Sequence, residues 1–357
     1  MSNYIFEIQT EIIKRLPMKS LVQFRSVLKQ WKSLIDSSQL IAEYQQNTRL
    51  QQHLLVRTDF FKYDCVSFLD NDTYPHQKVS ITVPESVPNQ IVGCSQGLFC
   101  FYDFHNAAVI WNPSIRKSVD VVVPGPFDGR FDNDNVGFGV CPRTLDPILV
   151  KIPTEYPIKN LDNTTWVVDV FRLSLGVWKS LCMDLPTWCI TSTCSQVVID
   201  KFIYWHVFER MSGYNLIISF DMISEEFTEI RLPDSLSGGN DDTDMYICKL
   251  KESLVVLQVD QTEFYGDCGV WMMDNGDPKS FENIYSIKSN IPDGSIQNVL
   301  EFNRNGEVIV VMTNEEKEHE LFVYEPISQH VNHLGISAKR PSFFVGSYTG
   351  TLLLLDH

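Results

Sequence analysis

The sequence predicts an α+β chain of two unequal parts, a small all-α head of three helices and an all-β body built as a propeller of about six blades. A helical apolar pattern is confined to about the first 45 residues. After it, an apolar strand that ends in an aromatic residue recurs about every 50 residues, each time before a second strand. Four strands in a unit of that length are typical of a propeller blade.

Composition favours a globular protein without a membrane span. Of the 357 residues, 44% are hydrophobic and 21% are charged, and no apolar run reaches the roughly 18 residues that a spanning helix needs. The first residues lack the basic and apolar regions of a secretory signal. Nine cysteines without a CxxC pair indicate reduced, buried thiols. We therefore expect a cytoplasmic or nuclear protein.

Charge is distributed unevenly between the two parts. Residues 1–46 carry a net charge of +2, so the net charge of −16 for the whole chain leaves −18 for the remainder. Nucleic-acid binding requires clustered lysine and arginine to contact phosphates. The acidic body therefore argues against nucleic acid as a main partner.

Apolar spacing predicts the helices of the head. Ile8, Ile12 and Leu16 recur at every fourth position, and Pro17 is expected to end this first helix. Ser20 is the expected N-cap of a second helix. An apolar stripe along one face of that helix comprises Leu21, Phe24, Leu28, Trp31 and Ile35. Ser37 or Ser38 is expected to cap a third helix, after which residues 45–52 are predicted to form a linker.

Three short helices rarely bury enough apolar surface to be stable alone, and single helices of this length are marginal in water. The stripe must therefore pack against something else. Either the body of the same chain or another protein could cover it, and the spacing of the residues does not decide between them.

The repeat in the body is marked by aromatic residues separated by 60, 49, 51 and 53 positions. They are Trp111, Phe171, Phe220, Trp271 and Tyr324, and Phe68 marks a possible earlier copy. We expect the tryptophans at 111, 178, 205 and 271 to fill the core between blades. Gly97, Gly139 and Gly306 are expected at turns. The last apolar run, 342–357, could pair with strands from residues 52–69 and close the ring.

Two stretches carry a resemblance to a known family. Residues 11–35, EIIKRLPMKSLVQFRSVLKQWKSLI, resemble the F-box of plant F-box proteins. In the body, GCSQGLFCF at 93–101, VIWNPSIRK at 109–117, DVFRLSLGVWKSL at 169–181 and ISFDMISEEFTEIRLP at 218–233 are similar to the F-box-associated domain of the same proteins. The resemblance covers nearly the whole chain.

The resemblance implies a substrate-recognition subunit of an SCF-type cullin ubiquitin ligase. Residues 1–47 would be the F-box, which binds a Skp-family adaptor and through it the cullin, and residues 48–357 would be a propeller-like domain that holds an unidentified target protein. The residues expected to bind the adaptor are Ile8, Ile12, Leu16, Pro17, Leu21, Arg25, Val27, Leu28, Lys29 and Trp31. Such a subunit is not an enzyme, and the resemblance implies no metal or cofactor.

Connecting loops of the body are the candidate surface for the target, because loops on a rigid scaffold often carry recognition. Their aromatic and methionine residues are Phe127, Phe131, Tyr156, Met211, Tyr214, Phe264 and Tyr265. These side chains lie among acidic residues. Aromatic anchors with an acidic rim suit a basic protein target.

Three other hypotheses remain open. The first predicted helix departs from the F-box pattern at Tyr4-Ile5 and Gln9, so the chain could be a protein-interaction propeller with a degenerate F-box. A sugar-binding or enzymatic propeller is a second alternative, although no catalytic motif is present, and the His330-x-x-His333 pair lacks a third metal ligand at a suitable spacing. A DNA-binding helix is the least favoured, because the acidic body would repel phosphate.

Overall fold

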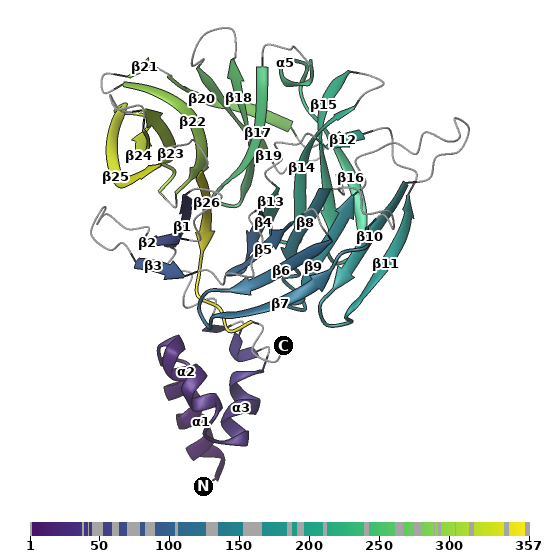
Figure 1. The fold of residues 1–357 in the computed structure, drawn as a ribbon, viewed down its shortest axis with the longest axis vertical. Helices are drawn as coiled ribbons and strands as arrows, with labels where there is room; N and C mark the ends of the chain where they lie inside the picture. Colours follow the sequence, from purple (N-terminus) through teal and green to yellow (C-terminus); the bar gives the residue numbers. More distant parts are fainter. Residues whose placement is uncertain are drawn as a thin grey trace.

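The computed structural model describes most of the chain, and the structural statements below refer to the residues that it describes. These are 2–37, 39–41, 43–44, 53–58, 64–69, 79–82, 90–103, 106–125, 135–152, 166–183, 188–190, 196–209, 213–238, 243–260, 267–274, 280–288, 290–291, 294–303, 305–313, 318–338 and 343–353. Figure 1 shows a helical head below a larger body of strands. The expected fold class, a helical head before a propeller of about six blades, is confirmed.

The head is built from α1 (Ser2–Ile13), α2 (Met18–Arg25) and α3 (Lys29–Ile35), followed by helical residues at 39–41 and 43–44. The N-cap of α2 is Pro17, not Ser20 as expected. Proline has a fixed φ that suits entry into a helix, and its carbonyl accepts hydrogen bonds from the amides of Ser20 and Leu21. Ser37 does cap the helical turn after α3, since its Oγ accepts a hydrogen bond from the amide of Leu40 at 3.3 Å.

The predicted second helix is broken into two. In a continuous helix, residues 25 and 36 would lie about 16 Å apart along the axis. Instead, the Arg25 guanidinium donates two hydrogen bonds to the Asp36 carboxylate, at 2.5 and 2.9 Å. The rings of Phe24 and Trp31 also meet edge to face with their centroids 5.0 Å apart. Both contacts require α3 to fold back along α2, and periodicity alone does not reveal them.

The described strands form six sheets, which we number as blades in chain order. Blade 1 consists of β26 (Phe343–Tyr348), β1 (His53–Thr58), β2 (Asp64–Leu69) and β3 (Val79–Thr82). Blade 2 consists of β4 (Gln90–Ser95), β5 (Leu98–Tyr102), β6 (Ala107–Asn112) and β7 (Lys117–Val122). Blade 3 consists of β8 (Asn135–Val140), β9 (Pro147–Ile152), β10 (Trp166–Arg172) and β11 (Val177–Met183).

The other three blades follow the same plan. Blade 4 consists of β12 (Trp188–Ile190), β13 (Val197–Ile199), β14 (Phe202–Glu209), β15 (Tyr214–Asp221) and β16 (Glu226–Arg231). A short helix, α5 (Asp234–Ser237), follows it. Blade 5 consists of β17 (Thr243–Leu250), β18 (Ser253–Asp260), β19 (Cys268–Asp274) and β20 (Ser280–Ile287). Blade 6 consists of β21 (Asn290–Ile291), β22 (Gly294–Phe302), β23 (Val308–Thr313), β24 (His319–Glu325) and β25 (His330–Ala338).

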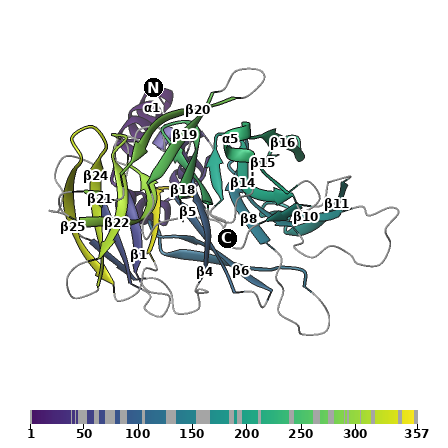
Figure 2. The same ribbon diagram turned by 90° about the horizontal axis from the view of Figure 1, so that it is seen from above.

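Ring closure follows the expected pairing of the chain ends. β26 pairs antiparallel with β1, with His53 opposite Tyr348 and Thr58 opposite Phe343. The strand β26 therefore completes the sheet that the first strands of the body begin. It also lies beside β22 of blade 6 and β4 of blade 2. Figure 2 shows the blades from above, arranged around a common centre. A ring closed in this way leaves no open edge between the first and last blades.

The aromatic repeat occupies the next-to-last strand of each sheet, in the strand order given above. Trp111, Phe220 and Tyr324 are almost completely buried, as is the ring of Trp205 in β14. Trp178 and Trp271 are only partly buried, although both pack against core clusters. Phe68 lies in the equivalent strand β2, so the possible earlier copy is a real one. The repeat in the sequence thus reports the blade structure directly.

Glycines in the first strand of blade 3 make room for blade 4. Gly97 and Gly306 have positive φ at turns, as expected. Gly139, however, lies inside β8, where an added Cβ would come within 2.6 Å of the Met222 sulfur. At Gly137 an added Cβ would lie 2.2 Å from Cζ2 of Trp205. These two glycines serve close packing rather than a turn.

Among the described residues, the structure shows free thiols at Cys94, Cys100, Cys141, Cys182, Cys248 and Cys268. Most are buried, and burial raises the pKa of the Cys268 thiol to about 12. Cys182 is exposed, so the expectation of buried thiols fails at this position. No described helix is both long and apolar enough to cross a membrane.

A charged cluster joins blades 3 and 4. Arg172 Nε lies 2.8 Å from Glu225 Oε1, and Lys179 Nζ lies 2.8 Å from Glu225 Oε2. Burial alone would raise the pKa of the Glu225 carboxyl, but the hydrogen bonds from Lys179 and Arg172 outweigh it and leave the pKa below the usual value. The ionised carboxylate therefore stabilises the fold at pH values above about 4.5, and this contribution is lost as the pH falls through the lowered pKa.

We expect Glu225→Gln to lower the free energy of unfolding by about 1 kcal/mol at pH 7, because charge-assisted hydrogen bonds become neutral ones. The difference in the free energy of unfolding between this variant and the wild type should shrink as the pH falls below 4.5, because the wild-type carboxyl itself then gains a proton. Urea unfolding at pH 7 and pH 4 measures both values. Glu226→Gln, at an exposed neighbouring position, is the matched control. If Glu225→Gln lowered the free energy of unfolding equally at both pH values, the ionised carboxylate of Glu225 would not be the source of the stabilisation.

Candidate functional site: the helical head and its junction with the body

One face of the head is buried in the same core as blade 2. Leu21 and Ile35 are completely buried and Leu40 is 2% exposed. They belong to a core cluster that also contains Leu352 and Leu353 from the C-terminal segment and several residues of β5 and β6. The body of the same chain therefore covers part of the apolar stripe. Leu21, one of the ten residues expected to bind the adaptor, contributes to the core instead of the surface.

Elsewhere the head exposes large apolar side chains. Ile8 and Ile12 on α1 are 60% and 56% exposed, and Val27 and Leu28 between α2 and α3 are 60% and 50% exposed. Ile8 and Ile12 are four residues apart, so they lie on one face of their helix. Removing four such side chains from water would be favourable, which makes these residues a candidate docking surface.

The remaining head residues predicted to bind an adaptor differ in their exposure. Pro17 and Lys29 are exposed, whereas Leu16 and Trp31 are partly buried against the core. Arg25 is engaged with Asp36, with only 18% of its side chain exposed. Its main role in the structure is thus to fix the turn that presents Val27 and Leu28.

The C-terminal segment 349–353 links the head to blade 2. The fully buried Asn112 side chain donates hydrogen bonds to the carbonyls of Thr351 and Leu353, at 2.9 and 2.8 Å. Its Oδ1 accepts a third from the amide of Ser114 at 2.9 Å. An added Cβ at Gly350 would lie 3.1 Å from Met18 Cε, so this segment contacts α2 directly. Figure 1 shows the yellow C-terminal segment at this junction, close to β7.

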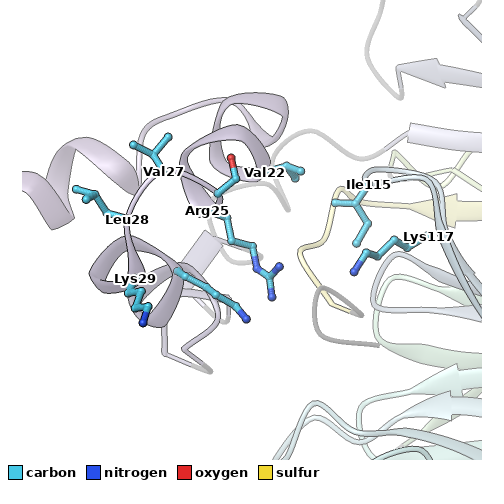
Figure 3. A pocket seen from close by; sticks show the side chains of 9 residues that line it. Val22, Arg25, Val27, Leu28, Lys29, Ile115 and Lys117 are labelled. Carbon is cyan, nitrogen blue, oxygen red and sulfur yellow. The ribbon is translucent and has the colours of Figure 1, made fainter.

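A groove of about 400 Å³ lies between the head and the turn that joins β6 to β7. Figure 3 shows Ile115 and Lys117 on the blade side, with Val22 and Arg25 across from them on the head. Lys29 and Lys32 also line the groove, together with Val27 and Leu28. We name this the junction groove. Sequence reasoning missed its blade side, although the adjacent basic residues Arg116 and Lys117 in an acidic body were a signal.

Only one of the seven candidate target-binding residues of the body lies among the described residues. Phe127, Phe131, Tyr156, Met211, Phe264 and Tyr265 lie outside the described residues. Tyr214 is described and is 55% exposed at the start of β15. It stays a candidate contact for a target.

No described group of three or more His, Cys, Asp or Glu side chains is placed to hold a metal ion. Of the two histidines in the HxxH pattern, His333 lies 3.4 Å from the Glu320 carboxylate and packs against the ring of Phe322. His206 is 7% exposed, and burial lowers its pKa while its Nε2 lies 3.0 Å from Asn215 Oδ1. His333 and His206 thus both have structural partners.

Comparisons with known proteins give matches to both parts of the chain. The F-box domain model matches residues 6–42, and the model of the F-box associated beta propeller domain matches residues 55–353. A putative F-box protein of Arabidopsis thaliana is 26% identical over 241 residues, which cover 64% of this chain but only 60% of the relative. F-box protein CPR1 of the same plant is 22% identical over 355 residues, covering 89% of this chain and 81% of the relative.

Another relative and a solved structure also match most of this chain. Another Arabidopsis thaliana F-box protein is 23% identical over 357 residues, covering 89% of this chain and 82% of its own. A putative TolB from Agrobacterium tumefaciens is 8% identical, with a TM-score of 0.41 over 84% of this chain and 98% of that chain. This superposition is too loose to carry an argument.

Proposed function

Because the chain belongs to the F-box proteins that carry an F-box associated β-propeller domain, we propose that it is the substrate-recognition subunit of an SCF-type cullin ubiquitin ligase. In this role the head binds a Skp-family adaptor and the propeller holds a target protein. The chain itself carries out no covalent step, and its task is to bring the target near the rest of the ligase. We place this activity in the cytoplasm or the nucleus.

The observation that carries the proposal is the division of the head into two faces. The buried face, with Leu21 and Ile35, anchors the head on the body, whereas Ile8, Ile12 and Leu28 remain exposed. A head held rigidly in this way can bind a partner without first folding, which lowers the entropic cost of association. We assign Ile8, Ile12, Val27 and Leu28 as the direct apolar contacts and Lys29 as a peripheral charge.

Target recognition is the second half of the proposal. Aromatic side chains such as Tyr214 would anchor a target at the loops of the propeller, and the net charge of −18 outside the head favours a basic partner. The target itself is to be identified by co-purification with the full chain.

Leu28→Asp is expected to weaken binding of the full chain to a plant Skp adaptor at least tenfold, because it places a charge at an exposed apolar contact. The same change should leave the melting temperature within about 2 °C of the wild type, since a surface substitution costs little stability. Isothermal titration calorimetry and thermal unfolding measure the two quantities.

Ile327→Asp is the matched control, because Ile327 is 93% exposed on blade 6 and lies outside the proposed surface. It should bind the adaptor like the wild type. The proposal fails if the wild-type chain does not bind the adaptor, or if Leu28→Asp and Ile327→Asp bind equally well.

The alternative is a protein-interaction propeller whose head serves only as a cap. The continuous core between the head and blade 2 favours it. In that case the chain would retain its target in co-purification while Skp and cullin are absent.

A further inference from the structure

The turns between the last two strands of four blades share one feature. Each spans four residues, 113–116 in blade 2, 173–176 in blade 3, 222–225 in blade 4 and 326–329 in blade 6. A large aliphatic side chain occupies one of the two central positions of each turn. We call these side chains the tip residues, and they are Ile115, Leu175, Ile223 and Ile327.

Blade 2 shows what a tip residue can bind. Ile115 is partly buried and packs against the core cluster that the head and blade 2 share, and Figure 3 shows it across the junction groove from Val22 of α2. In contrast, Leu175 is 65% exposed and Ile223 is 40% exposed. Val177, the first residue after the turn of blade 3, is 59% exposed. The tips of blades 3 and 4 therefore leave apolar surface in water where blade 2 contacts a helix.

Hydrogen bonds hold the turns of blades 3 and 4 side by side. The Arg172 guanidinium, just before the turn of blade 3, donates to the Met222 carbonyl and the Glu225 carboxylate in the turn of blade 4, both at 2.8 Å. The Asp146 carboxylate accepts hydrogen bonds from the amide and the hydroxyl of Ser174, at 2.9 and 2.6 Å. Apolar side chains on a rigid support lose little conformational entropy when a partner covers them.

All four turns lie on the side of the ring that carries the head. Each follows the same strand of its blade, and the turn of blade 2 packs against the core shared with the head. Leu173, two residues before the tip of blade 3, is 7% exposed and belongs to the core cluster that contains Leu21 and Ile35 of the head. The apolar interface between the head and blade 2 therefore continues to the base of the blade 3 turn.

The surroundings of the two exposed tips favour an apolar partner surface over an ionic one. Charged side chains beside the tips are paired with each other, since Glu225 binds Arg172 and Lys179, and Asp221 binds Lys201. An ionic ligand would have to compete with these pairs. An amphipathic helix would cover the tips without breaking them, as α2 does at the tip of blade 2.

We propose that Leu175 and Ile223 extend the docking surface of the head onto the propeller, and that the same Skp-family adaptor covers them with the apolar face of a helix. Two observations carry this proposal, the rigid pair of exposed tips and their continuity with the interface between the head and blade 2. The identity of the partner rests on the proposed function, whereas the apolar chemistry of the contact rests on the tips.

The double variant Leu175→Asp plus Ile223→Asp of the full chain is expected to bind a plant Skp adaptor at least tenfold more weakly, because two charges would be buried in an apolar contact. Isothermal titration calorimetry measures the affinity. Ile327→Asp is the matched control, because it makes the same change at the tip of blade 6, which blades 1 and 5 separate from blades 2 to 4. It should bind the adaptor like the wild type.

Hydrogen exchange of the wild-type chain gives a second reading that depends on no variant. Residues 173–176 and 222–225 should gain protection when the adaptor binds, whereas residues 326–329 should not. No gain at the first two turns with saturating adaptor would overturn the inference even if the double variant folded poorly.

Three further outcomes would also overturn the inference. If Leu28→Asp abolishes adaptor binding while Leu175→Asp plus Ile223→Asp binds like the wild type, the inference is wrong and the proposed function stands. If the wild type does not bind the adaptor, the proposed function and the inference both fail. If sedimentation velocity shows a dimer of the wild type that the double variant dissociates while adaptor binding is unchanged, the tips bind a second copy of the chain instead.

Discussion

Replacing Asn112 by alanine is expected to lower the free energy of unfolding by about 2–4 kcal/mol. The wild-type side chain is fully buried and makes hydrogen bonds to the carbonyls of Thr351 and Leu353 and to the amide of Ser114. Alanine would leave these three backbone groups without that partner in the interior, and an unsatisfied buried polar group costs about 1–3 kcal/mol. The expected loss is smaller than the sum of the three costs, because the C-terminal segment can relax and let water reach part of these groups.

The effect should extend to the attachment of the head. Leu352 and Leu353 lie in the core cluster shared by the head and blade 2, so a loosened C-terminal segment uncovers part of that core. We therefore expect a low concentration of protease to cleave Asn112→Ala faster than the wild type near residues 45–52, and gel electrophoresis measures this rate. Urea unfolding measures the change in the free energy of unfolding. Asn112→Asp should be at least as destabilising, since it loses both donors and buries a charge.

Asn332→Ala, on the exposed side of β25, is the control for the loss of an asparagine side chain. Its free energy of unfolding should stay within about 0.5 kcal/mol of the wild type. If Asn112→Ala behaved like Asn332→Ala, the C-terminal segment would not be held by Asn112 and the described junction would be wrong.

Gly137→Ala is expected to lower the free energy of unfolding by about 1–3 kcal/mol through overpacking. The new Cβ would lie 2.2 Å from Cζ2 of the Trp205 ring, which is 2% exposed and has little room to move. Blade 3 and blade 4 would have to separate locally to relieve the overlap. Chemical unfolding, followed by tryptophan fluorescence, measures the change.

A second substitution identifies the cause. Trp205→Phe removes the ring atom that the new methyl group would meet, so the double variant should cost less than the sum of the two single variants. Gly238→Ala is the control, because an added Cβ there meets nothing within 4 Å. Additive costs of Gly137→Ala and Trp205→Phe would show that their contact is not the source of the destabilisation.

The propeller could be predicted from the sequence because its determinants are local and repeated. Each blade places an aromatic residue in its next-to-last strand, so Trp111, Phe171, Phe220, Trp271 and Tyr324 recur at about the length of one blade. Closure by the last strand follows from the same count, since residues 343–348 form a strand without a hairpin partner after it. A repeated pattern of this kind can be recognised in the sequence even where the pattern of a single strand does not identify that strand.

The head and its junction could not be predicted in the same way. The break between α2 and α3 depends on Arg25 meeting Asp36, two residues that helical periodicity places far apart. Asn112 and Thr351 are separated by most of the body, and nothing in their local sequence indicates contact. Gly139 was expected at a turn because glycine tolerates positive φ, but it is needed for the approach of Met222.

In the proposed function, the head is fixed to its own body by one face and presents exposed apolar side chains to a partner. Hydrogen exchange of the full chain, alone and with the Skp adaptor, tests it most directly, because it reports protection segment by segment. We predict that residues 34–41 are protected in the free chain and unchanged by the adaptor, whereas residues 6–13 and 26–29 gain protection on binding. Rapid exchange of 34–41 in the free chain, or no gain at 6–13 and 26–29 with saturating adaptor, would contradict the account.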